Sequence, residues 1–334
     1  MKLVSVTPGQ NATGVNGTDP IEVTFDASVS PSSPMPELSP SIPGSWHVAG
    51  DTATFTPQTG YLPETTVTVK VPSGIEPAST SLSALKTTQT VKFTTGQYST
   101  LRLQELLAQL GYLPYTWTPS ASSGDIAGSD ASAQLAAAYD APAGTFALNG
   151  DYPSELTDQW AVGQDNMLVT GAVRAFEYNE GLTMDGDAGP EVWSHLLTAI
   201  AQDKKNPSGY SYALATQATG DNESLQVWHD GKQILDSPAN TGVAGASTQD
   251  GTYPVYEKLQ FQDMQGTNPD GSHYDDPVYW ISYFNGGDAV HGFVRASYGF
   301  YQSDGCVELP PTTAQFIWPY LTYGTLVTVQ GPVA

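Results

Sequence analysis

Apolar and polar residues alternate through the first 96 positions of the chain. The alternation covers residues 4–6, 21–25, 53–55, 67–71 and 91–93, with turns rich in Pro, Gly, Ser and Asn between the runs. A period of two is typical of strands that bury one face. The pattern predicts an all-β sandwich over residues 1–96, with Trp46 as a core candidate.

The period changes within residues 97–207. Leucines in the segment 103–110 fall at i, i+3, i+4 and i+7, which is one face of a helix, and similar faces occur around 169–176 and 192–200. This predicts a small, mainly α domain of three helices. The Ser-, Ala- and Gly-rich segment near 119–163 is interpreted as an insertion or a long loop within it.

Strand patterns return after Asn206-Pro207, and Asp230-Gly231 is a strong hairpin-turn signal between two of them. We therefore expect a mainly β domain at residues 208–334. Its predicted strands are 210–216, 225–229, 232–235, 251–256, 278–284, 290–293 and 326–329.

Composition narrows the class of protein. With 334 residues the chain exceeds one ordinary domain. A formal net charge of -23 repels nucleic acid, which we exclude as a partner. No apolar run is long enough to cross a membrane or to form a signal peptide, so we expect the export signal or anchor of a secreted protein to lie outside this sequence.

Chemistry is most plausible at the single cysteine. Cys306 follows a glycine in Ser303-Asp304-Gly305-Cys306-Val307, where a tight turn can point successive backbone N–H groups at one spot. A small core residue is the alternative interpretation. One cysteine allows neither an internal disulfide nor a Cys-rich metal site, and with no metal-ligand spacing or phosphate-binding glycine loop we expect no metal and no cofactor.

A thiol needs a base, and His291 stands fifteen positions upstream at the end of an apolar strand, beside Gly292. The imidazole can take the thiol proton or stabilise the thiolate. The other four histidines, His47, His195, His229 and His273, are interpreted as structural or solvent-exposed, with a substrate contact as the alternative for His273.

The N-terminal pattern resembles bacterial immunoglobulin-like domains of surface proteins. Within the helical region, Leu107-x-x-Leu110-Gly111-Tyr112, Val173-x-x-Phe176 and Asp185-Gly186-x-x-Gly189-Pro190-x-x-Trp193 are similar to a peptidoglycan-binding domain. In the alternative interpretation, Phe176 and Trp193 are core residues of a helical spacer.

Residues 209–331 resemble the L,D-transpeptidases, the cysteine enzymes that cross-link peptidoglycan. The motifs are His291-Gly292, Tyr298-Gly299 and the segment Ser303–Leu309, supported by Gly251-Thr252-Tyr253-Pro254 and by a substrate-covering loop near 266–287. Many family members have His at the position of Asp304, and Arg or Asn at that of Glu308.

The resemblance implies a mechanism. Cys306 is expected to be the nucleophile, His291 the base and later the acid, and the backbone N–H groups of Asp304, Gly305 and Cys306 the oxyanion hole. Ser303 is expected to shape the turn as part of the catalytic group, or to be a plain turn residue.

Four residues are substrate-binding candidates: Tyr279, Tyr283, Gly292 and Arg295. Tyr279 and Tyr283, with Trp280, are expected to wall the acyl-donor channel or else to pack in the core. Arg295 is expected to bind a stem carboxylate with its planar fork or else to form a salt bridge.

The resulting hypothesis is a monomeric L,D-transpeptidase at the bacterial cell wall or surface. It would act on peptidoglycan stem peptides and glycan, release D-alanine through a thioester, join two diaminopimelate residues, and be acylated by carbapenems. The alternatives are an L,D-carboxypeptidase that uses the same thiol, and a non-catalytic wall-binding scaffold.

Overall fold

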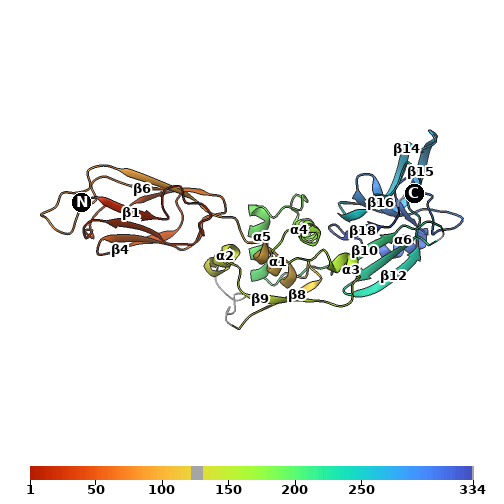
Figure 1. Cartoon of the computed structure of the whole chain (residues 1–334), viewed down its shortest axis with the longest axis horizontal. Coiled ribbons are helices and arrows are strands. Elements are labelled where there is room, and N and C mark those ends of the chain that lie inside the picture. The colour runs from red at the N-terminus through yellow and green to blue at the C-terminus, as the bar shows by residue number, and fades with distance from the viewer. Residues whose placement is uncertain (122–130, 221, 333–334) are drawn as a thin grey trace. The chain divides into compact units, whose positions relative to one another are not determined.

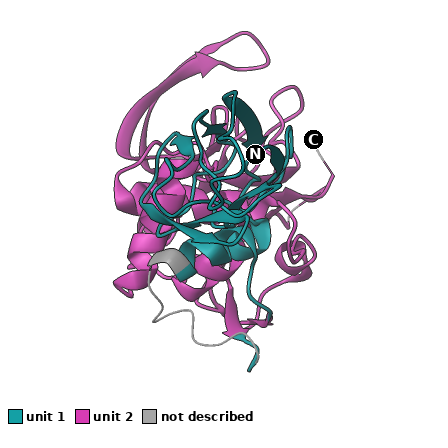
Figure 2. Cartoon of the chain, turned by 90° about the vertical axis from the view of Figure 1, so that its left-hand side faces the viewer, with its two compact units in different colours: residues 1–103, 119–143 teal, residues 104–118, 144–334 magenta. Residues whose placement is uncertain are grey.

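The computed structural model describes residues 1–121, 131–220 and 222–332, and for residues 131 and 132 only the backbone. The chain divides into two compact units (Figure 2): residues 1–103 with 119–143, and residues 104–118 with 144–334. Part of the helical region is thus grouped with the C-terminal β region. The boundaries after residues 96 and 207 remain a prediction from the sequence.

The N-terminal region is the predicted sandwich (Figure 1). One sheet has the strand order β1-β2-β5-β4 and the other β3-β6-β7, and their inner faces share one apolar core. The strands are β1 Leu3–Thr7, β2 Ile21–Phe25, β3 Glu37–Ser39, β4 Gly44–Ala49, β5 Thr52–Pro57, β6 Thr66–Val71 and β7 Gln89–Thr94.

One expectation in this region is wrong. Val4 was expected to share the buried face of Val6, yet it is 62% exposed, whereas Val6 is buried. The pairing of β1 with β2 shifts register between Leu3 and Ser5, and an extra residue at a bulge turns the following side chain to the other face. Trp46 packs against the sandwich core from a partly buried position, in contact with the ring of Phe55.

The three predicted helices are present as α1 Thr100–Gln109, α4 Met167–Glu180 and α5 Pro190–Ala201. The side chain of Asn166 accepts a hydrogen bond from the N–H of Val169 at the start of α4, and Gly181 ends it with φ +72°. Pro190 opens α5.

The long-loop interpretation of residues 119–163 is wrong for the part that the structure describes. This region contains β8 Tyr115–Pro119, α2 Ala131–Tyr139, β9 Gly144–Leu148 and α3 Ser154–Thr157. Strands β8 and β9 pair, and Tyr115 stacks on Trp160 with 4.3 Å between ring centroids. Residues 122–130 lie outside the described part.

Two sheets form the C-terminal region. The first has the order β12-β11-β10-β18-β13 and the second β14-β15-β16-β17. Strand β14, strand β17 and helix α6 were not predicted from the sequence. The elements are β10 Ser211–Thr216, β11 Ser224–His229, β12 Lys232–Pro238, β13 Gly251–Pro254, β14 Glu257–Thr267, β15 His273–Asn285, β16 Asp288–Gly292, β17 Val307–Leu309, α6 Pro311–Ile317 and β18 Leu326–Gln330.

The predicted turn between β11 and β12 is confirmed, and it meets another segment of the same unit. Asp230 and Gly231 have φ values of +45° and +73°. A Cβ atom on Gly150 would lie 2.4 Å from the Cα of Gly231, so two backbones touch where neither residue has a side chain. The N–H of Asp151 donates to the carbonyl of Gly231, and the N–H of Gly231 donates to the hydroxyl of Tyr152.

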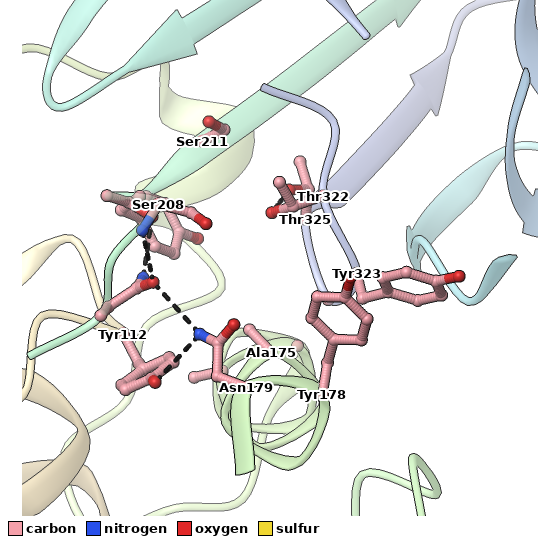
Figure 3. A pocket seen from close by; sticks show the side chains of 15 residues that line it. Tyr112, Ala175, Tyr178, Asn179, Ser208, Ser211, Thr322, Tyr323 and Thr325 are labelled. Carbon is pink, nitrogen blue, oxygen red and sulfur yellow. Dashed lines mark hydrogen bonds between the residues drawn. The ribbon is translucent and has the colours of Figure 1, made fainter. Parts of the chain in front are cut away.

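A small cavity lies where α4 meets the turn before β18 (Figure 3). Its volume is about 20 Å³, room for a water molecule, and its rim carries the stacked rings of Tyr178 and Tyr323. Asn179 donates a hydrogen bond to the hydroxyl of Tyr112 across it. Among the described helices, none is long and apolar enough to cross a membrane.

Candidate active site

Strands β16 and β17 bring the predicted histidine and cysteine to one face. They pair in parallel, with Val290 opposite Val307 and His291 opposite Glu308. Side chains alternate along a strand, so Val290 and Val307 enter the main core of the domain while His291 and Glu308 face the other way. Continued by one residue, the register sets Cys306 beside Ala289, diagonally next to His291.

The nucleophile turn before β17 presents unused donors. Gly305 has φ +106°, a conformation that favours glycine. The hydroxyl of Ser303 donates to the carbonyl of Cys306 at 2.6 Å, and its N–H donates to the carbonyl of Thr241. Within the described residues, none of the N–H groups of Asp304, Gly305 and Cys306 donates a hydrogen bond, and Asp304 and Cys306 line a cavity.

A cavity of about 500 Å³ covers this turn. Its walls come from the β14–β15 hairpin, which extends beyond the body of the unit in Figure 1, and from strands β16 and β17. Cys306, His291, Ser303, Asp304, Arg295 and Tyr283 all line it. The sequence motif therefore opens into one space that is large enough for a peptide segment.

The thiol of Cys306 is protonated at rest. Burial raises its pKa to about 12; the N–H of Ala289 opposes this, while the charges of Asp288, Glu308 and Asp304 add to it. The sulfur lies 3.8 Å from the carbonyl oxygen of Gly287. Such a thiol reacts only if a base removes its proton during attack.

His291 has the properties of that base. It is 3% exposed, and burial lowers its pKa below the ordinary value, although Glu308 opposes the shift. The ring is therefore neutral at pH 7. Its Nδ1 is buried without a hydrogen-bond partner among the described residues, which is unusual for a buried polar atom and leaves it free to interact with a ligand.

Glu308 is neutralised by Arg295. The guanidinium donates to both carboxylate oxygens, at 2.9 and 2.7 Å, and also to the carbonyl of Gln302. Asn240 supplies a further donor to Glu308 at 3.1 Å. The salt-bridge expectation for Arg295 is confirmed, and this pair ties β17 to the segment that enters the nucleophile turn.

Of the other substrate-binding candidates, only Tyr283 lines the cavity. The hydroxyl of Tyr283 donates to Gln262. Tyr279 is 46% exposed beside Phe261, and neither it nor Gly292 is among the cavity-lining residues. Gly292 lies against α6, where a Cβ atom would be 3.0 Å from the Cα of Pro311. Trp280 packs against the core and Trp318, as its core-packing alternative expected.

Sequence reasoning missed three acidic or phenolic residues of the cavity, Asp276, Asp288 and Tyr274. Asp288 had a usable signal, since a charged residue opens the apolar strand of His291. Among the described residues, no group of three or more His, Cys, Asp or Glu side chains is arranged to hold a metal ion.

Known protein families match the N-terminal and the C-terminal region of the chain. Residues 218–329 match the L,D-transpeptidase catalytic domain. Residues 1–95 match the bacterial Ig-like domain. Two of the three resemblances drawn from the sequence are therefore confirmed, and the chain is a multidomain protein with an Ig-like sandwich and an L,D-transpeptidase catalytic domain. The two matches leave residues 96–217 uncovered, so the peptidoglycan-binding interpretation stays a prediction.

Solved structures similar to this chain are L,D-transpeptidases. One from Mycobacterium smegmatis is 13% identical over 99% of both chains with a TM-score of 0.33. L,D-transpeptidase 3 of Mycobacterium tuberculosis, with a faropenem-derived adduct, is 13% identical over 99% of this chain and 98% of its own, with a TM-score of 0.32. The catalytic domain of the E. faecium enzyme is 25% identical over 36% of this chain and 96% of its own, at 0.33. TM-scores this low carry no structural argument, and no curated protein matches the chain.

Proposed function

We propose that the chain is a cysteine acyltransferase that cross-links peptidoglycan stem peptides at the bacterial cell wall or surface. The observation that carries this is the meeting of Cys306 and His291, whose Nδ1 has no partner among the described residues, in one cavity, at a turn whose N–H groups at 304–306 make no hydrogen bond to the described residues. This combination supplies a nucleophile, a base and an oxyanion site. One chain contributes every group named here, and we propose that it acts as a monomer.

In the first half-reaction His291 takes the thiol proton as the sulfur of Cys306 attacks the carbonyl before the terminal D-alanine. The N–H groups of Asp304, Gly305 and Cys306 hold the negative oxygen. His291 then gives its proton to the nitrogen of D-alanine, the C–N bond breaks, and a thioester remains. Because the thiol and the imidazole both start neutral, charge separates only during attack.

In the second half-reaction an amine of another stem attacks the thioester carbonyl. The C–S bond breaks, a new amide joins the two stems, and the thiol is restored. The contact with Glu308, made through Nε and Nη2, holds Arg295 at the cavity wall, and we assign the stem carboxylate of the donor to Nη1, the guanidinium nitrogen outside that contact. Tyr283 is assigned to the wall of the same channel.

The proposal is tested by intact-mass spectrometry after incubation with a carbapenem, an acyl donor that needs no acceptor. The wild-type protein is expected to gain one adduct, and Cys306→Ala none. His291→Ala is expected to gain the adduct far more slowly, whereas the matched control His273→Ala should gain it at the wild-type rate, because His273 is exposed and does not line the cavity. A folded wild-type protein that gains no adduct would favour the wall-binding scaffold instead.

A further inference from the structure

Asp288 is a cavity carboxylate to which the mechanism above gives no task. It opens β16, three residues before His291, and lines the same cavity as Cys306. A Cβ atom on Gly305 would lie 2.4 Å from its Oδ1, and the φ of +106° at Gly305 favours glycine there. Asp288 therefore reaches the residue immediately before the nucleophile.

The carboxylates around Cys306 differ in whether a cationic side chain pairs with them. On one side Arg295 pairs with Glu308, and it also counteracts the burial that raises the pKa of Asp304. On the other side burial raises the pKa of Asp288 to about 6, and the backbone N–H of Gln249 opposes this. One carboxylate is matched by a guanidinium, whereas the other has a neutral N–H donor.

A carboxylate in this setting favours a cationic ligand. At pH 7 Asp288 is ionised, and a desolvated carboxylate is stabilised by a cation that donates hydrogen bonds to it. The acyl acceptor is a primary amine, which is an ammonium ion in water at that pH. Water, the competing acceptor, has no charge for Asp288 to select.

We propose that Asp288 binds the ammonium group of the acyl acceptor and directs its nitrogen at the thioester on Cys306. This inference rests on the function proposed above. In the second half-reaction Asp288 accepts one ammonium proton and releases it to solvent. His291 accepts a second proton as the nitrogen attacks and passes it to the departing sulfur. The products are an amide and a restored thiol, with one proton in solution.

The test compares transfer with hydrolysis in a single reaction. A synthetic tetrapeptide ending in diaminopimelate–D-alanine forms the acyl-enzyme. The acceptor is either Nα-acetyl-lysine amide, which is charged at pH 7, or hydroxylamine, which is neutral. Mass spectrometry measures the amounts of the transfer product and of the hydrolysis product. Asp288→Asn is expected to lower the ratio of transfer to hydrolysis about tenfold for the charged amine, the effect of losing one charge-assisted hydrogen bond. For hydroxylamine the ratio should stay within about twofold.

The matched control is Asp276→Asn, which removes a cavity carboxylate on the side of Arg295, whose pKa it helps to raise. It should leave the ratio for the charged amine unchanged. An equal fall in both variants, or an unchanged ratio in Asp288→Asn, would overturn the assignment. Carbapenem adduct formation checks that each variant keeps its nucleophile turn.

Two outcomes separate this inference from the proposed function. If the wild-type protein forms no acyl-enzyme, both fail together. If it does form one but prefers hydroxylamine to the charged amine after correction for reactivity with a model thioester, only the role of Asp288 fails. This last comparison uses the wild-type protein and does not depend on how any variant folds.

Discussion

The N-terminal sandwich and the paired strands β16 and β17 bury different materials. The sandwich core is apolar, built on residues such as Phe25, Val67 and Val69 that are at most 1% exposed. The face of β16 and β17 toward the cavity instead buries His291 at 3% and Glu308 at 4%. Buried ionisable side chains that lack some of their hydrogen-bond partners are typical of catalytic sites.

The largest effect should come from His291→Ala. Loss of a general base slows a reaction about 10²- to 10⁴-fold, and carbapenem acylation of Cys306 should slow by that much while the sandwich stays intact.

In the wild-type protein the rate of acylation should be constant from pH 7 to 9 and fall only as the pH drops through the lowered pKa of His291. A rise above pH 8, as for a free thiol, would contradict a base mechanism. Adduct mass against time measures both.

Phe25→Ala should produce the opposite result. Removing a fully buried ring destabilises a core by about 3 to 5 kcal/mol, so the denaturant midpoint of the sandwich should fall. Acylation of Cys306 should remain within about twofold, because no cavity residue belongs to that core. If acylation fell in proportion to stability, the two regions would not be separable in the way their buried residues indicate.

Arg295→Met should lower stability through the polar face alone. The change leaves Glu308 buried without its bidentate partner, which costs about 3 kcal/mol. Adding Glu308→Leu removes the orphaned charge, and the double variant should recover more than half of that loss in denaturant unfolding. Additive losses would show that the pair is not coupled.

The smallest effect compares one hydroxyl from each region. Ser303→Ala removes a hydrogen bond to the carbonyl of Cys306, whereas Thr95→Val in the sandwich removes two, one from Thr95 to the carbonyl of Leu62 at 2.7 Å and one from the N–H of Thr65 to Thr95. The free energy of unfolding should fall by about 1 kcal/mol for each hydrogen bond lost. Only Ser303→Ala should also slow acylation, by a few-fold, because its bond shapes the nucleophile turn. Equal acylation rates would make Ser303 a plain turn residue.

Local patterns were sufficient to predict much of the fold. Alternation revealed most strands of the sandwich, and the spacing of leucines revealed α1. Strand β14 was not predicted because its sequence, from Glu257 to Thr267, is largely polar on both faces and half-exposed. Such a hairpin is stabilised by its pairing with β15, which no local period records.

The site was predictable where its residues are close in sequence. Cys306, His291 and the turn between 303 and 307 are short motifs, and the structure brings them to one cavity. The pairing of Arg295 with Glu308, and the position of Asp288 against Gly305, depend on the parallel register of β16 with β17 and on the path of the turn. Sequence spacing alone does not contain that register.

The contact between Gly150 and Gly231 limits how the catalytic region can be exchanged. The hairpin turn of β11 and β12 seals against backbone that lies some eighty positions earlier in the chain, with Tyr152 satisfying one of its N–H groups. A fragment cut at residue 208 would leave that N–H without its partner and the turn without its cover. A chimaera that joins the catalytic region to another N-terminal domain would therefore have to include the segment around residues 149–152.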